Sequence, residues 1–281
     1  MRFYTFLQLG NTLQQVLGSE GGKVVEETAA QVGSSSGSVM ETLGGILSTG
    51  EIWYFIFAGA ALVLTLWAQS AVKSRFAKYD KVKSKKNITG AQAANYLLQQ
   101  NGITDVKIAH ISGNLTDNYN PTTKVLSLSD STYASTSIAA IGVAAHETGH
   151  AIQHNVGYNP IKTRSALVPV ANLGSQFGPI VAVAGISMVA AGVAFGDLMI
   201  KIGLGLFAGA VAFYLVTLPV EFNASRRALK ILESGGVMDK DELSDTRKVL
   251  SAAAMTYVAS AFSAIGSFIR LLVMSKSSKR R

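Results

Sequence analysis

Four long apolar segments dominate the pattern of hydrophobic and polar positions along this chain. They are residues 52–68, 179–195, 202–220 and 251–274. The first three contain no charged side chain, and the fourth contains only Arg270. Runs of this length can cross a hydrocarbon core of about 30 Å. The pattern therefore predicts a first transmembrane helix over residues 51–70, a transmembrane hairpin over 166–220 and a fourth apolar helix over 251–275.

The composition of these segments favours membrane insertion over burial in a soluble core. Trp53, Tyr54 and Trp67 fall at the two ends of the first segment, where interfacial aromatic rings belong. Glycine and alanine are frequent in both arms of the hairpin, as expected where membrane helices pack closely. The mean hydropathy of the whole chain is +0.30, which is high for a soluble protein. We therefore expect a multi-pass protein of the cell (plasma) membrane.

Charge is unevenly distributed around the first apolar segment. The net charge is +8, and a basic stretch follows that segment over residues 73–86. The positive-inside rule places this stretch in the cytoplasm and the polar extension, residues 1–50, outside. Four complete spans would put the basic tail, residues 276–281, outside as well, against the same rule. Either the fourth segment lies in the interface or re-enters, or the tail is an exception.

The polar regions between the apolar segments predict a small α+β unit. Residues 71–165 and 221–250 form its two sections. Thr89 and Gln92 have the spacing of a capping box, and Gly102 is placed to end that helix. Strand-like segments lie near 106–111 and 124–128, joined by a turn-rich loop over 113–121. A helical pattern then extends from Ser135 to His154.

This last predicted helix contains three histidines and a glutamate in the stretch Ala-Ala-His-Glu-Thr-Gly-His-Ala-Ile-Gln-His, residues 144–154. His146 and His150 are one helical turn apart, so both imidazoles can bind one zinc ion at about 2.0–2.1 Å. Glu147 is rotated by roughly 100°, close enough to act as general base on a zinc-activated water. Gly149 weakens a helix by about 1 kcal/mol relative to alanine, which indicates a close approach there.

A catalytic zinc site needs a third protein ligand, and the chain has no cysteine. Glu221 is the strongest candidate, because the hairpin returns the chain to the side it left. Pro219 is placed to mark the start of a new helix there. The alternative is a glutamate favoured at a helix N-terminus by the helix dipole. His154 is about 12 Å from His146 on a straight helix, too far to bind the same ion. We expect His154 to support a zinc ligand or to face solvent, and we expect His110 to be structural.

Three stretches together resemble the YugP-type bacterial membrane zinc metallopeptidases. They are Leu-Thr-Asp-Asn-Tyr-Asn-Pro at 115–121, Val-Ala-Ala-His-Glu-Thr-Gly-His-Ala-Ile-Gln-His at 143–154, and Leu-Pro-Val-Glu-Phe-Asn-Ala-Ser-Arg-Arg-Ala at 218–228. The resemblance covers about residues 52–275 and extends to the HtpX-like and CAAX-protease-like gluzincins. It implies zinc ligands at His146, His150 and Glu221, with Glu147 as catalytic base. The family loop usually reads Thr-Asp-His-Tyr-Asp-Pro, and Asn118 and Asn120 replace its His and Asp here.

These observations predict an α-helical membrane protein with a small α+β zincin-like catalytic domain. Along the chain, the helix with the His-Glu-x-x-His (HExxH) motif comes first, the transmembrane hairpin follows, and the helix that bears the glutamate ligand comes last. The predicted function is a zinc-dependent metalloendopeptidase in the lipid bilayer, with its active site facing the cytoplasm. We expect a membrane-adjacent or unfolded polypeptide substrate that pairs with strand 124–128 as an edge strand. Arg226 and Tyr119 are the candidates to stabilise the oxyanion.

Two other functions remain open at this point. The first is a non-catalytic zinc-containing membrane scaffold or chaperone-like binder, against which the intact Glu147 argues, because a structural zinc site needs no base. The second is a nucleic-acid binder, suggested by the basic balance of the chain. That function needs aromatic and basic residues interleaved on one face, which the sequence does not show, so we expect no nucleic-acid partner. The sequence does not indicate an oligomeric state.

Overall fold

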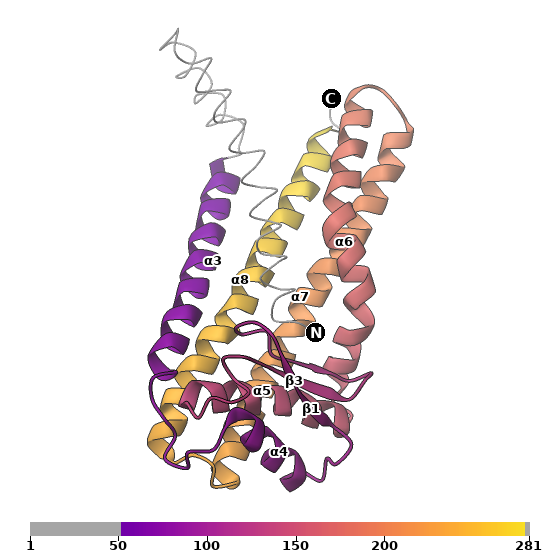
Figure 1. The fold of residues 1–281 in the computed structure, drawn as a ribbon. Coiled ribbons are helices and arrows are strands. Elements are labelled where there is room, and N and C mark those ends of the chain that lie inside the picture. The colour runs from indigo at the N-terminus through magenta and orange to yellow at the C-terminus, as the bar shows by residue number, and fades with distance from the viewer. Residues whose placement is uncertain (1–51, 279–281) are drawn as a thin grey trace, which may run out of the picture.

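The computed structural model describes residues 52–278, and Figure 1 shows their arrangement. The polar extension over residues 1–50 and the last three residues of the basic tail lie outside the described residues. Long helices run side by side along most of the height of the molecule. A small unit of short helices and strands covers one end of them (Figure 1). The molecule is therefore a helical bundle with a compact α+β cap at one end.

Among residues 52–278, four helices are long and apolar enough to cross a membrane. They are α3 (Ile52–Tyr79), α6 (Asn159–Ala190), α7 (Phe195–Ser234) and α8 (Lys240–Ser278). Many large apolar side chains on them are exposed, among them Trp53, Ile180 and Val273, as expected for surfaces that face lipid. Three of the four predicted apolar segments lie within candidate spans, and the segment 179–195 extends through the turn between α6 and α7. The chain is therefore a membrane protein.

Helix α8 is a single helix of 39 residues, about 58 Å long at 1.5 Å per residue. Its end near Lys276 lies at the same end of the bundle as the α6–α7 turn, opposite the α+β cap (Figure 1). The length and course of α8 fit a complete fourth span, and whether it crosses the membrane stays a prediction. Arg270, the one charge in that segment, lies 3.9 Å from the ring centroid of Tyr54 on α3. This cation–π contact accounts for a charge inside an apolar helix.

Helices α6 and α7 form the predicted hairpin and approach each other through small residues. An added Cβ on Gly174 would lie 2.0 Å from the Leu206 carbonyl oxygen, and one on Gly203 would lie 2.4 Å from the Ala182 nitrogen. Neither distance leaves room for a methyl group. The close packing predicted from the glycine and alanine content is confirmed, and it follows the preference of membrane helices for small residues at their contacts.

The α+β cap contains α4 (Gly90–Gln100), α5 (Ile138–Asn155) and a three-stranded sheet. The strands are β1 (Lys107–Ile111), β2 (Asn118–Asn120) and β3 (Val125–Ser129). Thr89 and Gln92 form the predicted capping box of α4, and Gly102 follows that helix with a φ of 69°. Leu126 and Leu128 of β3 pack with the buried face of α5 in one apolar cluster. The sheet thus supports the helix that bears the paired histidines.

Strand β3 lies in the middle of the sheet, in the order β1-β3-β2. It pairs in parallel with β1 and antiparallel with β2. The prediction that this strand is an edge open to substrate is therefore wrong. The turn-rich loop contains β2, whose three residues occupy that edge, and so short a strand carries too weak a local signal to be read from the sequence.

Helix α7 continues through Pro219 without a break. The prediction that Pro219 marks the start of a new helix is therefore wrong, and Glu221 belongs to the second arm of the hairpin. A proline removes one backbone donor, but such helices tolerate it where neighbouring groups supply hydrogen bonds. Close to Pro219, Thr217 donates to the Phe213 carbonyl at 2.8 Å, and Gln153 of α5 donates to the Val220 carbonyl at 2.8 Å, which ties this part of α7 to α5.

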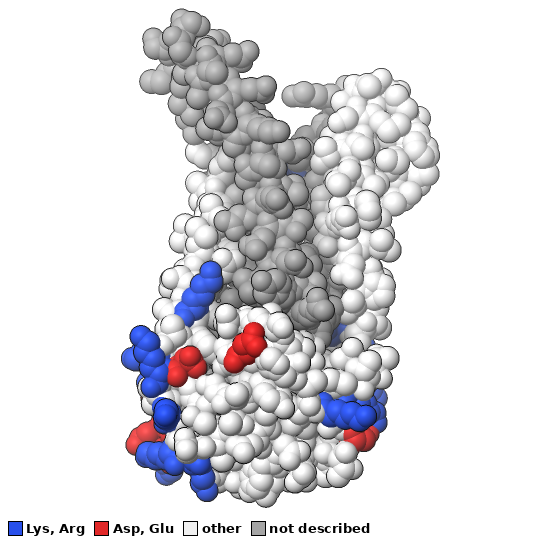
Figure 2. Space-filling view, in the orientation of Figure 1, with Lys and Arg blue, Asp and Glu red and all other residues white. Residues whose placement is uncertain are grey.

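Charged side chains mark the boundary between the bundle and its cap. Figure 2 shows lysine, arginine and acidic residues gathered over the α+β cap, while the described bundle surface above it is almost free of charge. Glu221 is 26 residues from the start of α7 at Phe195, about 39 Å along the helix. That length exceeds the hydrocarbon core of about 30 Å. The predicted ligand therefore lies where the bundle meets the cap.

Candidate metal centre

Helix α5 presents His146 and His150 from the buried interior of the cap. Ser137 caps the helix by accepting from the Ala140 backbone N–H at 3.1 Å. The two imidazoles are 7% and 8% exposed, and their ring centroids are 4.8 Å apart. A Cβ on Gly149 between them would lie 2.7 Å from the Ala224 carbonyl oxygen of α7. The close approach predicted at Gly149 is confirmed, and it is the backbone of α7 that approaches.

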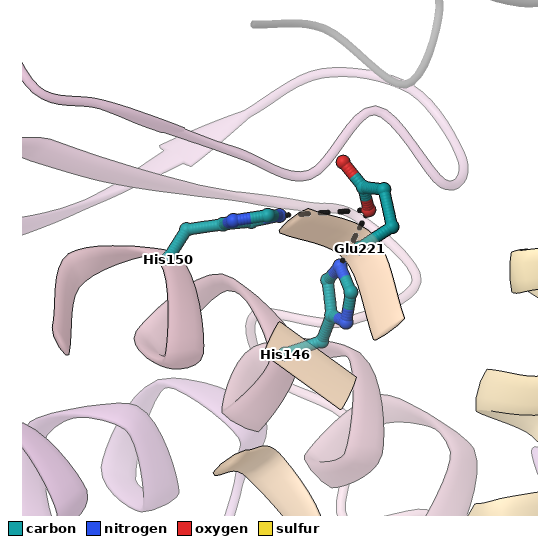
Figure 3. Close-up of side chains that lie close together, drawn as sticks. All are labelled: His146, His150 and Glu221. Atoms are coloured by element: carbon teal, nitrogen blue, oxygen red, sulfur yellow. Dashed lines mark hydrogen bonds and ion pairs between the residues drawn. The ribbon is translucent and has the colours of Figure 1, made fainter. Parts of the chain in front are cut away.

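Glu221 reaches the two histidines from α7, as Figure 3 shows. Its Oε2 lies 3.2 Å from His146 Nε2 and 3.6 Å from His150 Nε2. Possible ligand atoms of all three residues lie within 4.8 Å of one another, and all three side chains are buried. Tetrahedral bonds of about 2.05 Å place ligand atoms about 3.3 Å apart. The spacing of these atoms therefore fits a single zinc ion.

The hydrogen bonds on the far side of each imidazole leave Nε2 facing Glu221. Gln153 Nε2 donates to the Val220 carbonyl at 2.8 Å and to Asn223 Oδ1 at 3.0 Å, so its Oε1 is the acceptor for His150 Nδ1 at 3.0 Å. In neutral His150 the Nδ1 atom thus carries the proton, and Nε2 carries a lone pair. That lone pair points at a carboxylate oxygen 3.6 Å away. Two acceptors at this distance repel, unless a cation lies between them.

His146 has an equivalent partner on its other nitrogen. Its Nδ1 lies 3.1 Å from Ser225 Oγ, one helical turn after Glu221 on α7. Burial alone would lower the pKa of His146, but the neighbouring Glu221 carboxylate raises it above its usual value. The same carboxylate would also attract a metal cation to this imidazole. The two-histidine, one-carboxylate donor set is one of those found in catalytic zinc sites, and it leaves a fourth position open.

Arg164 of α6 completes the surroundings of Glu221. Its Nη1 lies 3.1 Å from Glu221 Oε1, and the arginine side chain is itself buried. The Oε1 atom has no hydrogen bond of good alignment, so the contact is an ion pair. One carboxylate oxygen thus faces the guanidinium and the other faces the imidazoles. Arg164 therefore leaves Oε2 free for a metal while offsetting the buried negative charge.

Glu147 lies next to the cluster and is 4% exposed. Together with His146, Glu221 and Tyr257 of α8 it lines a cavity of about 20 Å³. A cavity needs about 10–15 Å³ to hold a water molecule. The space between the predicted base and the predicted ligands is therefore sized for one water.

Asp117 ties the loop before β2 to the end of β3. Its carboxylate accepts from the Ser129 backbone N–H at 2.8 Å and from the Ser129 hydroxyl at 2.9 Å. Burial raises the pKa of Asp117, since desolvation disfavours its charged form. Asn118 and Asn120 serve the same loop, because Asn118 donates to the Thr116 carbonyl and Asn120 Oδ1 accepts from two backbone N–H groups. In this chain these amides stabilise turns.

The remaining predicted residues lie apart from the cluster. The His154 ring packs against Tyr119 at 5.8 Å between centroids, and burial lowers its pKa. His110 pairs with Asp130 at 2.7 Å on the exposed side of the sheet, in agreement with its predicted structural role. Tyr119 packs in the apolar cluster of the cap. Arg226 lines a separate, larger cavity.

Sequence reasoning missed four polar residues that contact or line the site: Gln153, Arg164, Ser225 and Tyr257. Gln153 carried a usable signal, since it lies three residues after His150 and so on nearly the same helical face. Ser225 likewise follows Glu221 by four residues. Arg164 and Tyr257 carried none, because they reach the site from α6 and α8 through tertiary packing alone.

Comparison with known proteins identifies relatives of this chain. A sequence model of the family described as "Putative neutral zinc metallopeptidase" matches residues 54–276. A curated relative, "Putative membrane protease YugP" of Bacillus subtilis (strain 168), is 43% identical over 226 residues, which cover 78% of this chain and 96% of the relative. No solved structure gives a significant match. The chain therefore belongs to this family of membrane-associated neutral zinc metallopeptidases.

Proposed function

We propose that this protein is a membrane-embedded zinc-dependent endopeptidase, with His146, His150 and Glu221 as zinc ligands and Glu147 as general base. The observation that carries the proposal is the convergence of three buried ligand atoms within 4.8 Å, from helices far apart in the sequence. The family description and the protease name of the relative agree with it. The active site faces the cytoplasmic side of the cell membrane. The basic stretch over residues 73–86 lies at the same end of the bundle as the cap, and the positive-inside rule places that stretch in the cytoplasm.

Zinc bound here would polarise a water molecule and lower its pKa toward about 7. Glu147 lines the one-water cavity, and its carboxylate accepts the proton that this water releases. The water oxygen bonds to the peptide carbonyl carbon, and the carbon–nitrogen bond breaks. Glu147 then gives the proton to the departing amine. The chain's own residues thus hold the metal, place the water and move one proton.

The negative charge that develops on the carbonyl oxygen needs a hydrogen-bond donor. The earlier candidates, Arg226 and Tyr119, lie outside the one-water cavity. Tyr257 lines that cavity and is 8% exposed, so we assign it the role of donor. Its phenol group reaches the cavity from α8, a different helix from the zinc-binding helix α5.

The test compares the purified, zinc-loaded wild type with Glu147→Gln and Tyr257→Phe on unfolded casein. Glu147→Gln should keep its zinc and lose at least about 10²–10⁴-fold in hydrolysis rate, because the base is gone while the ligands stay. Tyr257→Phe should keep zinc and substrate affinity and lose about 10²–10³-fold in kcat. His146→Ala and Glu221→Ala should lose the metal itself.

The non-catalytic alternative makes the opposite prediction. A zinc-containing scaffold or chaperone-like binder would hold stoichiometric zinc and cleave nothing, and Glu147→Gln would then leave every measured property unchanged. Hydrolysis that persists at the wild-type rate in Glu147→Gln would show that another residue acts as base. Metal analysis of each variant separates a failure of zinc binding from a failure of catalysis.

A further inference from the structure

A second and much larger cavity adjoins the metal centre. It has a volume of about 620 Å³, within the range of about 300–1,000 Å³ found for ligand sites. Helices α3, α7 and α8 form its walls. Helices α3 and α7 both pack along α8, which forms the floor between them. Nothing in the proposed chemistry so far uses this space.

The large cavity lies beside the proposed catalytic pocket. Ser225, Leu250 and Ala254 line both cavities, so these side chains form the wall that separates them. Ser225 is also the residue beside His146 Nδ1, at 3.1 Å. The catalytic cavity of about 20 Å³ admits a water but no peptide. A polypeptide that reaches the metal centre must therefore approach from a larger space, and this one is adjacent.

The end of the large cavity nearest the α+β cap is strongly cationic. Arg75 of α3, Arg226 and Lys230 of α7, and Arg247 of α8 line it, against the single carboxylate of Glu233. We call this set, with the space between them, the cationic groove. Three of these cations form no ion pair with any carboxylate of the described residues: Arg226, Lys230 and Arg247. Cations that outnumber the carboxylates in the lining of a cavity attract an anionic partner.

The other end of the cavity is apolar. Along α3, Trp67 and Ala71 precede Arg75 on the way toward the cap, and along α7 Phe222 precedes Arg226. Met255 continues the apolar lining on α8. The lining therefore changes from apolar on the bundle side to cationic on the cap side. A ligand that matches both ends has an apolar stretch next to an acidic one.

We propose that the cationic groove binds the substrate polypeptide, and that it selects chains in which an acidic stretch adjoins an apolar or membrane-spanning one. This inference rests on the proposed peptidase function and names its substrate class. It also explains how a cytoplasmic protease spares most of its neighbours. Membrane proteins carry excess lysine and arginine on their cytoplasmic ends, which the cationic groove repels.

The test measures binding separately from cleavage. Glu147→Gln protein, full-length and zinc-loaded in neutral detergent, is titrated with two labelled peptides that share one apolar stretch. One peptide is flanked by aspartates and the other by lysines, and fluorescence anisotropy gives each Kd. The aspartate peptide should bind at least about tenfold more tightly, and its affinity should fall as salt is raised. Equal affinities, or a preference for the lysine peptide, would overturn the proposal.

Charge reversal then locates the effect. Arg226→Glu combined with Arg247→Glu, in the Glu147→Gln background, should reverse the preference between the two peptides. The matched control combines Lys81→Glu with Lys107→Glu, two exposed cations outside the groove that change the net charge equally. A control that shifts the preference as strongly would show that overall charge, and not the groove, selects the ligand. If the double reversal misfolds, Lys230→Gln should still weaken aspartate-peptide binding alone.

The competing occupant is an anionic lipid headgroup, which also suits cations at a membrane boundary. Vesicles of phosphatidylcholine with and without phosphatidylglycerol distinguish the two. Binding of phosphatidylglycerol that depends on Arg226 and Arg247, with no peptide preference, would reassign the groove to lipid and overturn the proposal. A peptide preference in a protein that cleaves nothing would instead keep the binding site and reject the peptidase function.

Discussion

Gln153 shows how a neutral side chain can prepare a metal ligand. Its amide nitrogen has two acceptors on α7, so its oxygen is left to hold His150 Nδ1 at 3.0 Å. The orientation of one amide thus sets the tautomer of the imidazole and directs its lone pair toward Glu221. Partners of this kind commonly contribute about 10–100-fold to metal affinity.

Replacing Gln153 by alanine should therefore weaken zinc binding by about 10–100-fold, because His150 loses both its orientation and its preferred tautomer. Competition with a chromophoric chelator measures the affinity. The control is Gln99→Ala, an exposed glutamine on α4. Unchanged zinc affinity in Gln153→Ala would mean that the packing of α5 alone orients His150.

The contact between α5 and α7 explains why the histidine pair and Glu221 meet. Gly149 lets the Ala224 backbone approach within a distance that excludes a side chain. Ala224 is one turn beyond Glu221 on the same helix, so this contact sets the depth at which the carboxylate enters the site. A glycine that weakens an isolated helix thereby permits the arrangement of the whole site.

Gly149→Ala should push α5 and α7 apart and lower both thermal stability and zinc affinity. Overpacking of this kind costs about 1–3 kcal/mol, which exceeds the gain in helix propensity of about 1 kcal/mol. The matched control is Gly59→Ala on α3, where a Cβ meets nothing within 4 Å and the melting temperature should hold or rise. Thermal unfolding with and without a chelator gives both quantities. A Gly149→Ala protein as stable as wild type would contradict the proposed helix contact.

The arrangement of all four candidate spans raises a question of orientation. The end of α8 near Lys276 and the α6–α7 turn share one end of the bundle, and the cap with the metal cluster occupies the other. If the basic stretch after α3 is cytoplasmic, the basic C-terminus is outside, against the positive-inside rule. Orientation is set largely by the first helix and by short loops, so a terminal cluster can be an exception.

The absence of native cysteine makes this orientation simple to test. Single substitutions Val193→Cys at the hairpin turn, Ser277→Cys near the end of α8 and Thr123→Cys in the cap each introduce one exposed thiol. In intact cells a membrane-impermeant maleimide should label the first two, and it should label Thr123→Cys only after permeabilisation. Labelling of Ser277→Cys only after permeabilisation would show that α8 does not cross the membrane.

By itself the sequence determined the features that depend on neighbours in the chain. The length and composition of the apolar runs predicted four helices that can span a membrane, and the capping box at Thr89 predicted the start of α4. The four-residue spacing of His146 and His150 predicted one shared helical face. These features follow from helical geometry and from the thickness of the bilayer, which act over a few turns or one span.

Tertiary structure decided everything that joins distant segments. Only packing shows that Pro219 lies within α7, that β3 lies in the middle of the sheet, and that Arg164 and Tyr257 reach the metal cluster. The cationic groove likewise exists only because α3 and α7 both pack along α8. Contacts of this kind depend on the shapes of surfaces far apart in the sequence, and no local periodicity or spacing records which surfaces will meet.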